Sequence, residues 1–89
     1  MPVEVEFLAG YVGRYSLAKG NVLTITLDGD QLFAQRGGEL KVPIYAESRV
    51  DYFCRPFDEQ VSFRVDAQGF AIGLTLTQSG MTRAAKRIR

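Results

Sequence analysis

The 89-residue sequence has no histidine and no tryptophan, and it contains one cysteine and three prolines. Without histidine, the chain lacks the side chain that most often acts as a general base or binds a transition metal. Because Cys54 is the single cysteine, neither an internal disulfide nor a cluster of thiolate ligands can form. We therefore assign no catalytic, cofactor-binding or metal-binding residue from the sequence, and we expect no cofactor.

An excess of charge and a long apolar run are also lacking. Eleven basic and ten acidic residues give a net charge of +1, which is not the composition of a nucleic-acid-binding domain. No stretch is long enough for a membrane span, and the first residues do not resemble a signal peptide, so the compartment stays open. One local basic cluster, which we expect to be a solvated terminal strand, comprises Arg83, Lys86, Arg87 and Arg89.

What the sequence does contain is a two-residue alternation of apolar and polar side chains. In the segment 22–27, Leu23, Ile25 and Leu27 share one face of a strand, and Asp28-Gly29-Asp30 then predicts a tight hairpin. Similar segments recur after short turns along the chain. The predicted strands span residues 12–17, 22–27, 31–35, 40–44, 49–54, 60–65, 70–76 and 81–88.

Eight short strands joined by turns predict one all-β domain over residues 1–89. We expect a lipocalin-like up-and-down meander that closes into a small barrel, with a helical turn near residues 6–11; an open curved sheet is the alternative. Pro43 indicates an edge or a bulge, and the last strand is expected to meet the first around Tyr15. The predicted inward set is Leu23, Ile25, Leu27, Leu32, Leu40, Val42, Ile44, Val61, Phe63, Val65, Ile72, Leu74 and Leu76.

Serine and carboxylate patterns give weak signals for catalysis. The segment 16–19 has the Ser-x-x-Lys spacing, but it runs into a turn, where a lysine has no reason to lower its pKa. Asp28 and Asp30 fit turn chemistry better than a calcium loop. The serines that could act as nucleophiles by residue type are Ser16, Ser48, Ser62 and Ser79, and none has a histidine to activate it.

The aromatic side chains and the single cysteine are the remaining candidates for binding or reactivity. The aromatic side chains are more typical of a filled barrel interior, although a small apolar ligand among them is an open alternative. We expect Cys54 to be a buried, unreactive thiol, because it lies in an apolar run. The aromatic residues in question are Tyr11, Tyr15, Phe33, Tyr45, Tyr52, Phe53, Phe57, Phe63 and Phe70.

Several spaced stretches resemble a known family. They are 11–15 (YVGRY), 23–26 (LTIT), 28–35 (DGDQLFAQ), 43–48 (PIYAES), 61–64 (VSFR) before Gly69, 78–80 (QSG) and 84–88 (AAKRI). In this order they resemble the small lipocalin-like β-domains appended to serine β-lactamase-like peptidases and esterases. That family is labelled domain of unknown function DUF3471, or Pab-type peptidase C-terminal domain.

This resemblance implies an accessory role. In such enzymes the Ser-x-x-Lys and Tyr catalytic motifs belong to a separate upstream domain, and no catalytic residue carries over to this chain. We therefore expect a non-catalytic module that acts in substrate access or assembly, by contact with a serine hydrolase domain or with its own copies. A small lipocalin-like binding protein for an apolar ligand is the alternative.

Overall fold

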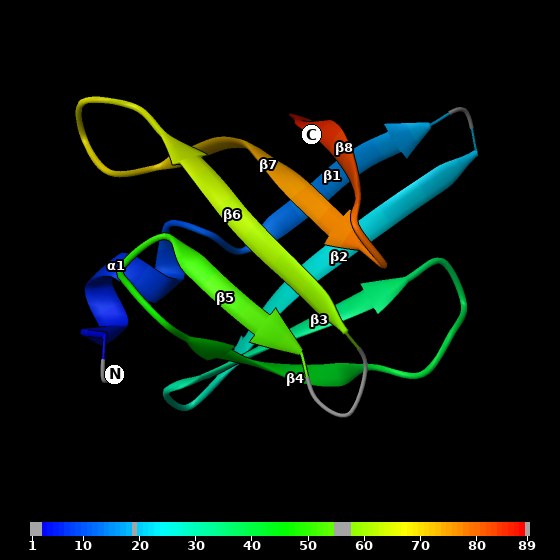
Figure 1. Cartoon of the computed structure of the whole chain (residues 1–89). Coiled ribbons are helices and arrows are strands. Elements are labelled where there is room, and N and C mark those ends of the chain that lie inside the picture. The colour runs from blue at the N-terminus through cyan, green and yellow to red at the C-terminus, as the bar shows by residue number, and fades with distance from the viewer. Residues whose placement is uncertain (1–2, 19, 55–57, 89) are drawn as a thin grey trace.

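Alternating apolar and polar residues form eight antiparallel strands that follow one another around a closed barrel (Figure 1). The computed structural model describes residues 3–18, 20–54 and 58–88. The predicted all-β barrel with a short N-terminal helix is confirmed. The elements are α1 (Val5–Ala9), β1 (Gly13–Ala18), β2 (Asn21–Asp28), β3 (Gln31–Arg36), β4 (Val42–Ala46), β5 (Asp51–Cys54), β6 (Glu59–Val65), β7 (Ala71–Gln78) and β8 (Met81–Ile88).

Two hairpins use two-residue turns that fix the register of the strands beside them. Asp28 pairs with Gln31 across the first turn, where Gly29 has a positive φ of 64°. In the β7–β8 turn, Ser79 and Gly80 both have positive φ, at 48° and 82°. Turns of this kind match the right-handed twist of the strands, so the local sequence sets the hairpin geometry.

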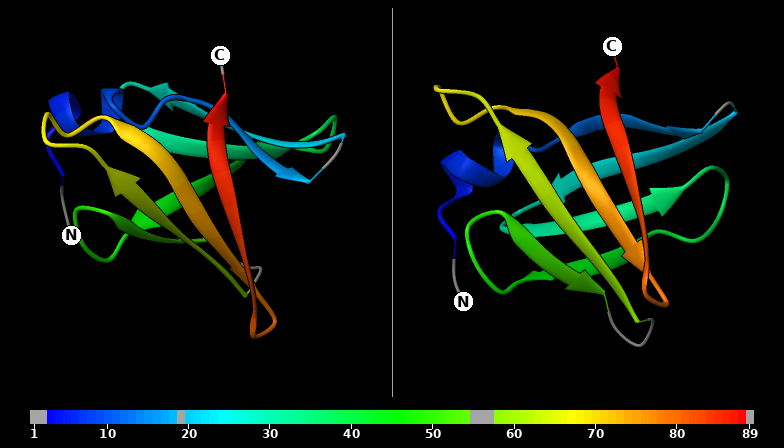
Figure 2. Two further views of the ribbon diagram at one scale, coloured as in Figure 1. Left: turned by 90° about the horizontal axis from the view of Figure 1, so that it is seen from above. Right: turned by 45° about the horizontal axis from the view of Figure 1, so that its top comes forward.

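The sheet closes because β8 pairs on both sides. It pairs with β7 from the hairpin as far as Gly73 opposite Lys86, and then with β1 at three positions. Tyr15 lies opposite Arg87 at the centre of that short β1–β8 register, as the sequence predicted. Beyond Lys86, β8 leaves β7 and follows β1, so β7 and β8 diverge toward the C-terminal end of β8 (Figure 2).

The helix α1 is fixed at one end of the barrel. It ends at Gly10, and the backbone N–H of Ala71 at the start of β7 donates to the Gly10 carbonyl over 3.0 Å. The Arg49 guanidinium lies 4.4 Å from the centre of the Phe7 ring. The backbone carbonyl of Arg49 accepts a hydrogen bond from the Tyr11 hydroxyl at 2.6 Å. Contacts from the start of β7 and from the β4–β5 loop therefore hold α1 over this opening.

The barrel interior contains most of the predicted inward set. An eight-stranded barrel has an interior just wide enough to be filled by side chains. Leu27 and Val42 are partly buried against the core. The fully buried members of the set are Leu23, Ile25, Leu32, Ile44, Val61, Phe63, Leu74 and Leu76; the core also contains Leu8, Tyr11, Tyr15, Ala34, Tyr52, Cys54, Ala71 and Ala85.

Three residues of the predicted inward set are exposed, and the assignment was wrong for them. Leu40 is 85% exposed because β4 begins only at Val42. Val65 and Ile72 are 39% and 53% exposed because the β6–β7 register shifts after Arg64. The shift leaves Ile72 as an extra residue in β7, so the alternation changes phase there.

Pro43 lies inside the closed sheet, so the prediction of a sheet edge at this residue was also wrong. It pairs with Phe33 of β3, and no register shift interrupts the β3–β4 ladder. On its other side, the register between β4 and β5 begins at Ile44. Proline has no N–H to donate, and this position at the start of a ladder tolerates that loss.

Phe63→Ala should lower the free energy of unfolding by roughly 3–5 kcal/mol, because it removes the ring at the centre of the aromatic core. The cost follows from three ring contacts, with Tyr11, Tyr15 and Tyr52. Urea denaturation followed by circular dichroism measures it. Ile72→Ala is the control, since that side chain is 53% exposed; equal losses in both variants would contradict the core assignment.

Candidate functional site

Two of the candidate serines meet at one carboxylate. Ser62 on β6 donates to Asp51 Oδ1 at 2.6 Å, and Ser48 donates to Asp51 Oδ2 at 2.9 Å. The Ser48 hydroxyl also accepts from the backbone N–H of Asp51 at 3.0 Å. These hydrogen bonds, that from Ser62 first, hold the pKa of Asp51 below its usual value. The group therefore organises the β4–β5 loop.

This serine–aspartate cluster is poorly suited to nucleophilic chemistry. A general base must take a proton near neutral pH, whereas a carboxylate with a lowered pKa is a weak base. Ser16 pairs in the sheet between Val22 and Lys86, and Lys19 of the Ser-x-x-Lys spacing lies outside the described residues. Ser79 lies in the exposed β7–β8 turn. The structure thus brings Ser48 and Ser62 together at a carboxylate, and among the residues that the structure describes neither hydroxyl has an activating base of the kind that acyl transfer uses.

Residues able to ligate a metal are dispersed. In residues 3–18, 20–54 and 58–88, no three histidine, cysteine, aspartate or glutamate side chains lie close enough to hold a metal ion. Asp28 and Asp30 flank the β2–β3 turn, and Cys54 is buried in the core as expected. The same part of the chain contains no helix long and apolar enough to cross a membrane.

A group of aromatic rings fills the α1 end of the barrel interior. The Tyr11 ring stacks on Phe63 with 4.4 Å between ring centres, and Tyr15 and Tyr52 contact Phe63 edge-on. The Tyr15 hydroxyl donates to the Tyr11 carbonyl at 2.7 Å. Burial raises the pKa of Tyr15 to about 12 and raises the pKa of Tyr11 and Tyr52 as well. These tyrosines are core residues with satisfied hydroxyls.

The aromatic packing leaves little interior space for a ligand. A hollow of about 160 Å³ opens beside Leu8, Leu32 and Tyr52, below the roughly 300–1,000 Å³ of ordinary ligand pockets. Other predicted aromatic residues lie outside the core: Tyr45 contacts Phe53, and Lys41 lies over Phe33. Phe57 lies outside the described residues. The geometry therefore favours core filling over an internal apolar ligand.

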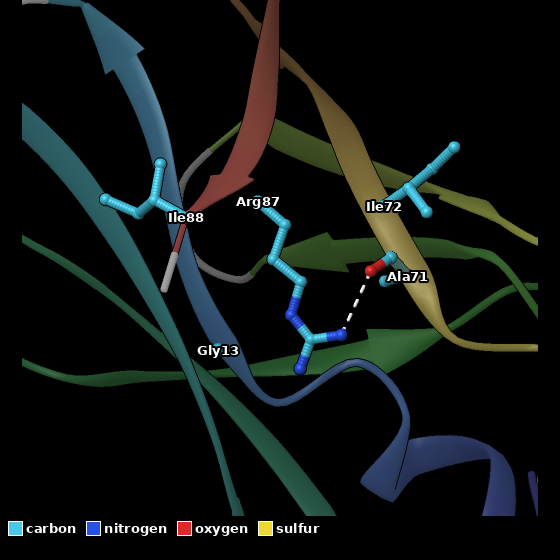
Figure 3. Close-up of a pocket in the computed structure, with 5 residues that line it drawn as sticks. All are labelled: Gly13, Ala71, Ile72, Arg87 and Ile88. Carbon is cyan, nitrogen blue, oxygen red and sulfur yellow. Dashed lines mark hydrogen bonds between the residues drawn. The ribbon is translucent and has the colours of Figure 1, made fainter.

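A larger hollow of about 510 Å³ opens where β7 and β8 diverge. We call it the seam hollow, and it is lined by Gly13, Ala71, Ile72, Arg87 and Ile88. Figure 3 shows the Arg87 side chain extending between β1 and β7, with Ile72 on one side and Ile88 on the other. Its guanidinium donates to the Ala71 carbonyl at 3.0 Å and to the Val12 carbonyl.

Arg87 is exposed, as expected for a solvated basic terminal strand, but its guanidinium is hydrogen-bonded to two carbonyl groups at the barrel opening. Ala85 faces the core, so Arg87 two residues later lies on the same, inward face of β8, opposite the buried Tyr15. Gly13 makes room for it, because a Cβ there would come within 2.7 Å of Arg87 Nε. Arg83 and Lys86 are exposed as well, and Arg89 lies outside the described residues.

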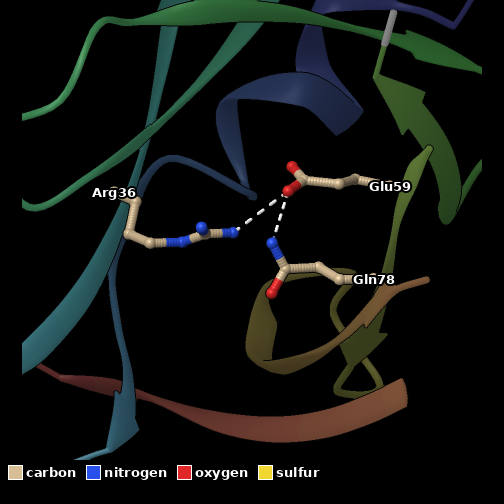
Figure 4. A network of polar contacts seen from close by, with 3 residues as sticks. All are labelled: Arg36, Glu59 and Gln78. Carbon is tan, nitrogen blue, oxygen red and sulfur yellow. Dashed lines mark hydrogen bonds and ion pairs between the residues drawn. The ribbon is translucent and has the colours of Figure 1, made fainter. Parts of the chain in front are cut away.

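The end of the barrel opposite α1 is crossed by a polar network. Arg36 at the end of β3 reaches Glu59 of β6 with 3.3 Å between Nη2 and Oε2, and Gln78 of β7 donates to the same carboxylate oxygen. Figure 4 shows the three side chains converging from opposite walls. Sequence reasoning missed this network because its members are far apart in the chain.

Three exposed apolar residues belong to the β6–β7 hairpin, and we call them the hairpin patch: Val65, Phe70 and Ile72. The turn that presents them is tightly bonded. One carboxylate oxygen of Asp66 accepts from the backbone N–H groups of Gln68 and Phe70 at 2.9 and 3.0 Å. Exposed apolar groups held on an ordered turn are typical of a surface that contacts another polypeptide.

Comparison with known proteins identifies the family. The model of a family described as domain of unknown function (DUF3471) matches residues 2–88. The chain belongs to this family, as its sequence motifs suggested.

One curated relative is penicillin-binding protein 4* of Bacillus subtilis (strain 168), which is 23% identical over 87 residues. The match covers 98% of this chain and 19% of that protein, so the chain spans about a fifth of its relative's length. No solved structure matches the chain.

Arg87→Ala should lower the free energy of unfolding by roughly 1–2 kcal/mol, because two carbonyl groups at the seam lose a charged donor. Urea denaturation measures the loss. Arg83→Ala, on the exposed part of the same strand, should stay within about 0.5 kcal/mol of the parent. If Arg87→Ala were as neutral as Arg83→Ala, the guanidinium would not support the seam.

The protein should lose stability as pH rises from about 10 toward 12. Tyrosine in the unfolded chain ionises near its ordinary pKa of 10.0, whereas the folded-state pKa of Tyr15 is about 12. The stabilising contribution of the neutral Tyr15 hydroxyl to folding is therefore complete below pH 10. It is lost as the pH rises from 10 toward 12, because tyrosine in the unfolded chain releases its proton first. Thermal melts across this range test the slope, which should be smaller in Tyr15→Phe; a slope unchanged in that variant would contradict the assignment.

Proposed function

We propose that this DUF3471 domain is a non-catalytic accessory module that contacts a β-lactamase-like serine hydrolase domain and acts in substrate access or assembly. The relative's name, penicillin-binding protein, and its greater length support a setting beside such a domain. The observation that carries the proposal is the hairpin patch, which holds three of the seven large apolar side chains that are exposed in the described residues; the other four lie on different elements and are Val5, Leu40, Tyr45 and Met81.

The candidate chemistry of the chain supports a contact role. Ser48 and Ser62 donate to Asp51, whose lowered pKa makes it a poor proton acceptor at neutral pH. The aromatic interior is occupied by Tyr11, Tyr15 and Phe63 packed against one another. An internal ligand site, the alternative interpretation of the sequence, therefore receives no support from the packing.

The hairpin patch is suited to anchoring a partner. Phe70 and Ile72 are 55% and 53% exposed, so burying the remaining half of each side chain is worth about 0.8–1.5 kcal/mol. The Asp66 hydrogen bonds fix the turn before any partner arrives, so little ordering entropy is lost on binding. A patch of three apolar side chains can form the centre of an interface, and surrounding polar residues would make up the remaining contact area.

Two measurements test this proposal. The purified 89-residue chain should show no hydrolysis of a chromogenic β-lactam, a D-amino-acid peptide or an aryl ester. It should also associate with a β-lactamase-like serine hydrolase domain from the same genome, added as a separate protein. The double variant Phe70→Ser/Ile72→Ser should weaken that association by at least about tenfold, as expected for two lost apolar anchors.

Leu40→Ser is the matched control, because Leu40 is 85% exposed but lies in the β3–β4 loop at the other end of the barrel. Hydrolysis by the purified chain would overturn the non-catalytic role. Association that survives the double variant would overturn the assignment of the surface. If sedimentation instead shows dimers of the chain that the double variant disrupts, the patch serves self-association and not a hydrolase contact.

A further inference from the structure

The seam hollow has features of a binding site in its own right. It exists because β8 transfers its pairing from β7 to β1 near Lys86, which leaves the start of β7 separated from the end of β8. The gap has a volume of about 510 Å³, within the usual range for small-ligand sites. Its lining combines one guanidinium with two exposed or half-buried isoleucines, and the backbone at Gly13 carries no side chain.

The charge in the seam hollow is not neutralised by an acidic side chain. In residues 3–18, 20–54 and 58–88, the one ion pair joins Arg36 to Glu59 at the opposite end of the barrel. Arg87 gives two of its five N–H donors to the carbonyls of Ala71 and Val12. Arg14 pairs with Ile88 in the register, and Lys86 precedes Arg87, so the neighbouring charges are also positive. This arrangement attracts an anion.

The two carbonyl hydrogen bonds hold the guanidinium in one orientation. A fixed guanidinium presents a planar fork of donors, which matches the two oxygens of a carboxylate. Ile72, which is 53% exposed, and Ile88, which is half-buried, line the hollow on either side of the Arg87 side chain (Figure 3). Apolar walls add affinity for a carboxylate that carries an apolar group and add none for a small, strongly hydrated anion.

We propose that the seam hollow binds an organic carboxylate with an apolar substituent. Arg87 receives the carboxylate, and Ile72 and Ile88 contact the substituent. The inference does not depend on the accessory role proposed above, because the binding is a property of the isolated chain. If the chain does not associate with a hydrolase domain, the carboxylate-binding proposal still stands. If the carboxylate does not bind, the proposed contact surface for the hydrolase domain still stands.

NMR titration of the full chain with 4-methylpentanoate tests the proposal. We expect saturable shifts at the Arg87 Nε–H and at the amides of Gly13, Ile72 and Ile88. The neutral amide of the same acid should bind at least about tenfold more weakly, because it lacks the charge that the guanidinium recognises. Acetate, which retains the carboxylate but not the apolar group, should also bind more weakly.

Three variants locate the site. Ile72→Ser, at an exposed position, should weaken binding several-fold without altering the fold. Arg87→Lys retains the charge but loses the planar fork, and in the folded variant binding should fall by about tenfold. Arg83→Ala is the control and should bind as the parent does. Non-saturable shifts that are equal at Arg14, Arg83 and Arg87, or inorganic phosphate that binds as tightly as the apolar acid, would overturn the proposal.

Discussion

The structure depends on filling an eight-stranded barrel, to which the described part of the chain adds one short helix, α1. Its interior can accept side chains but little else, so each end must be closed by groups from the chain itself. At one end, α1 and the Tyr11–Phe63 stack complete the core, and at the other the ion pair between Arg36 and Glu59 crosses the opening. The packed side chains leave little of the interior open, and the hollow beside Leu8 and Leu32 has a volume of only about 160 Å³.

The strand order, the hairpins and most of the inward face could be predicted from the sequence, because they follow from local rules. Alternation places Leu23 and Ile25 on one face, and the turn at Gly29 sets the register beside them. Alternation failed at Ile72 because an extra residue in β7 changes its phase. The prediction from alternation also failed at Leu40, because the alternating pattern extends two residues ahead of Val42, where β4 begins.

The seam hollow could not be predicted, because it arises from the divergence of two strands and not from a motif. One signal for Arg87 was nevertheless present. Ala85 and Arg87 have the same parity in β8, and a charge on an inward position near a strand end indicates a cap at the barrel opening. The polar network of Glu59 and Gln78 gave no such signal, since its third member is supplied by β3.

The pairing of β1 with β8 joins residues seventy or more positions apart, such as Arg14 and Ile88. During synthesis, β1 to β7 can form as successive hairpins as they leave the ribosome, but the edge of β1 stays unpaired until β8 has emerged. Contacts between distant segments also slow folding, because the ends must meet before any stabilisation is gained. The growing chain therefore exposes the unpaired edge of β1 until β8 has been synthesised. An unpaired edge can pair with another chain, so the risk of aggregation is greatest during this time.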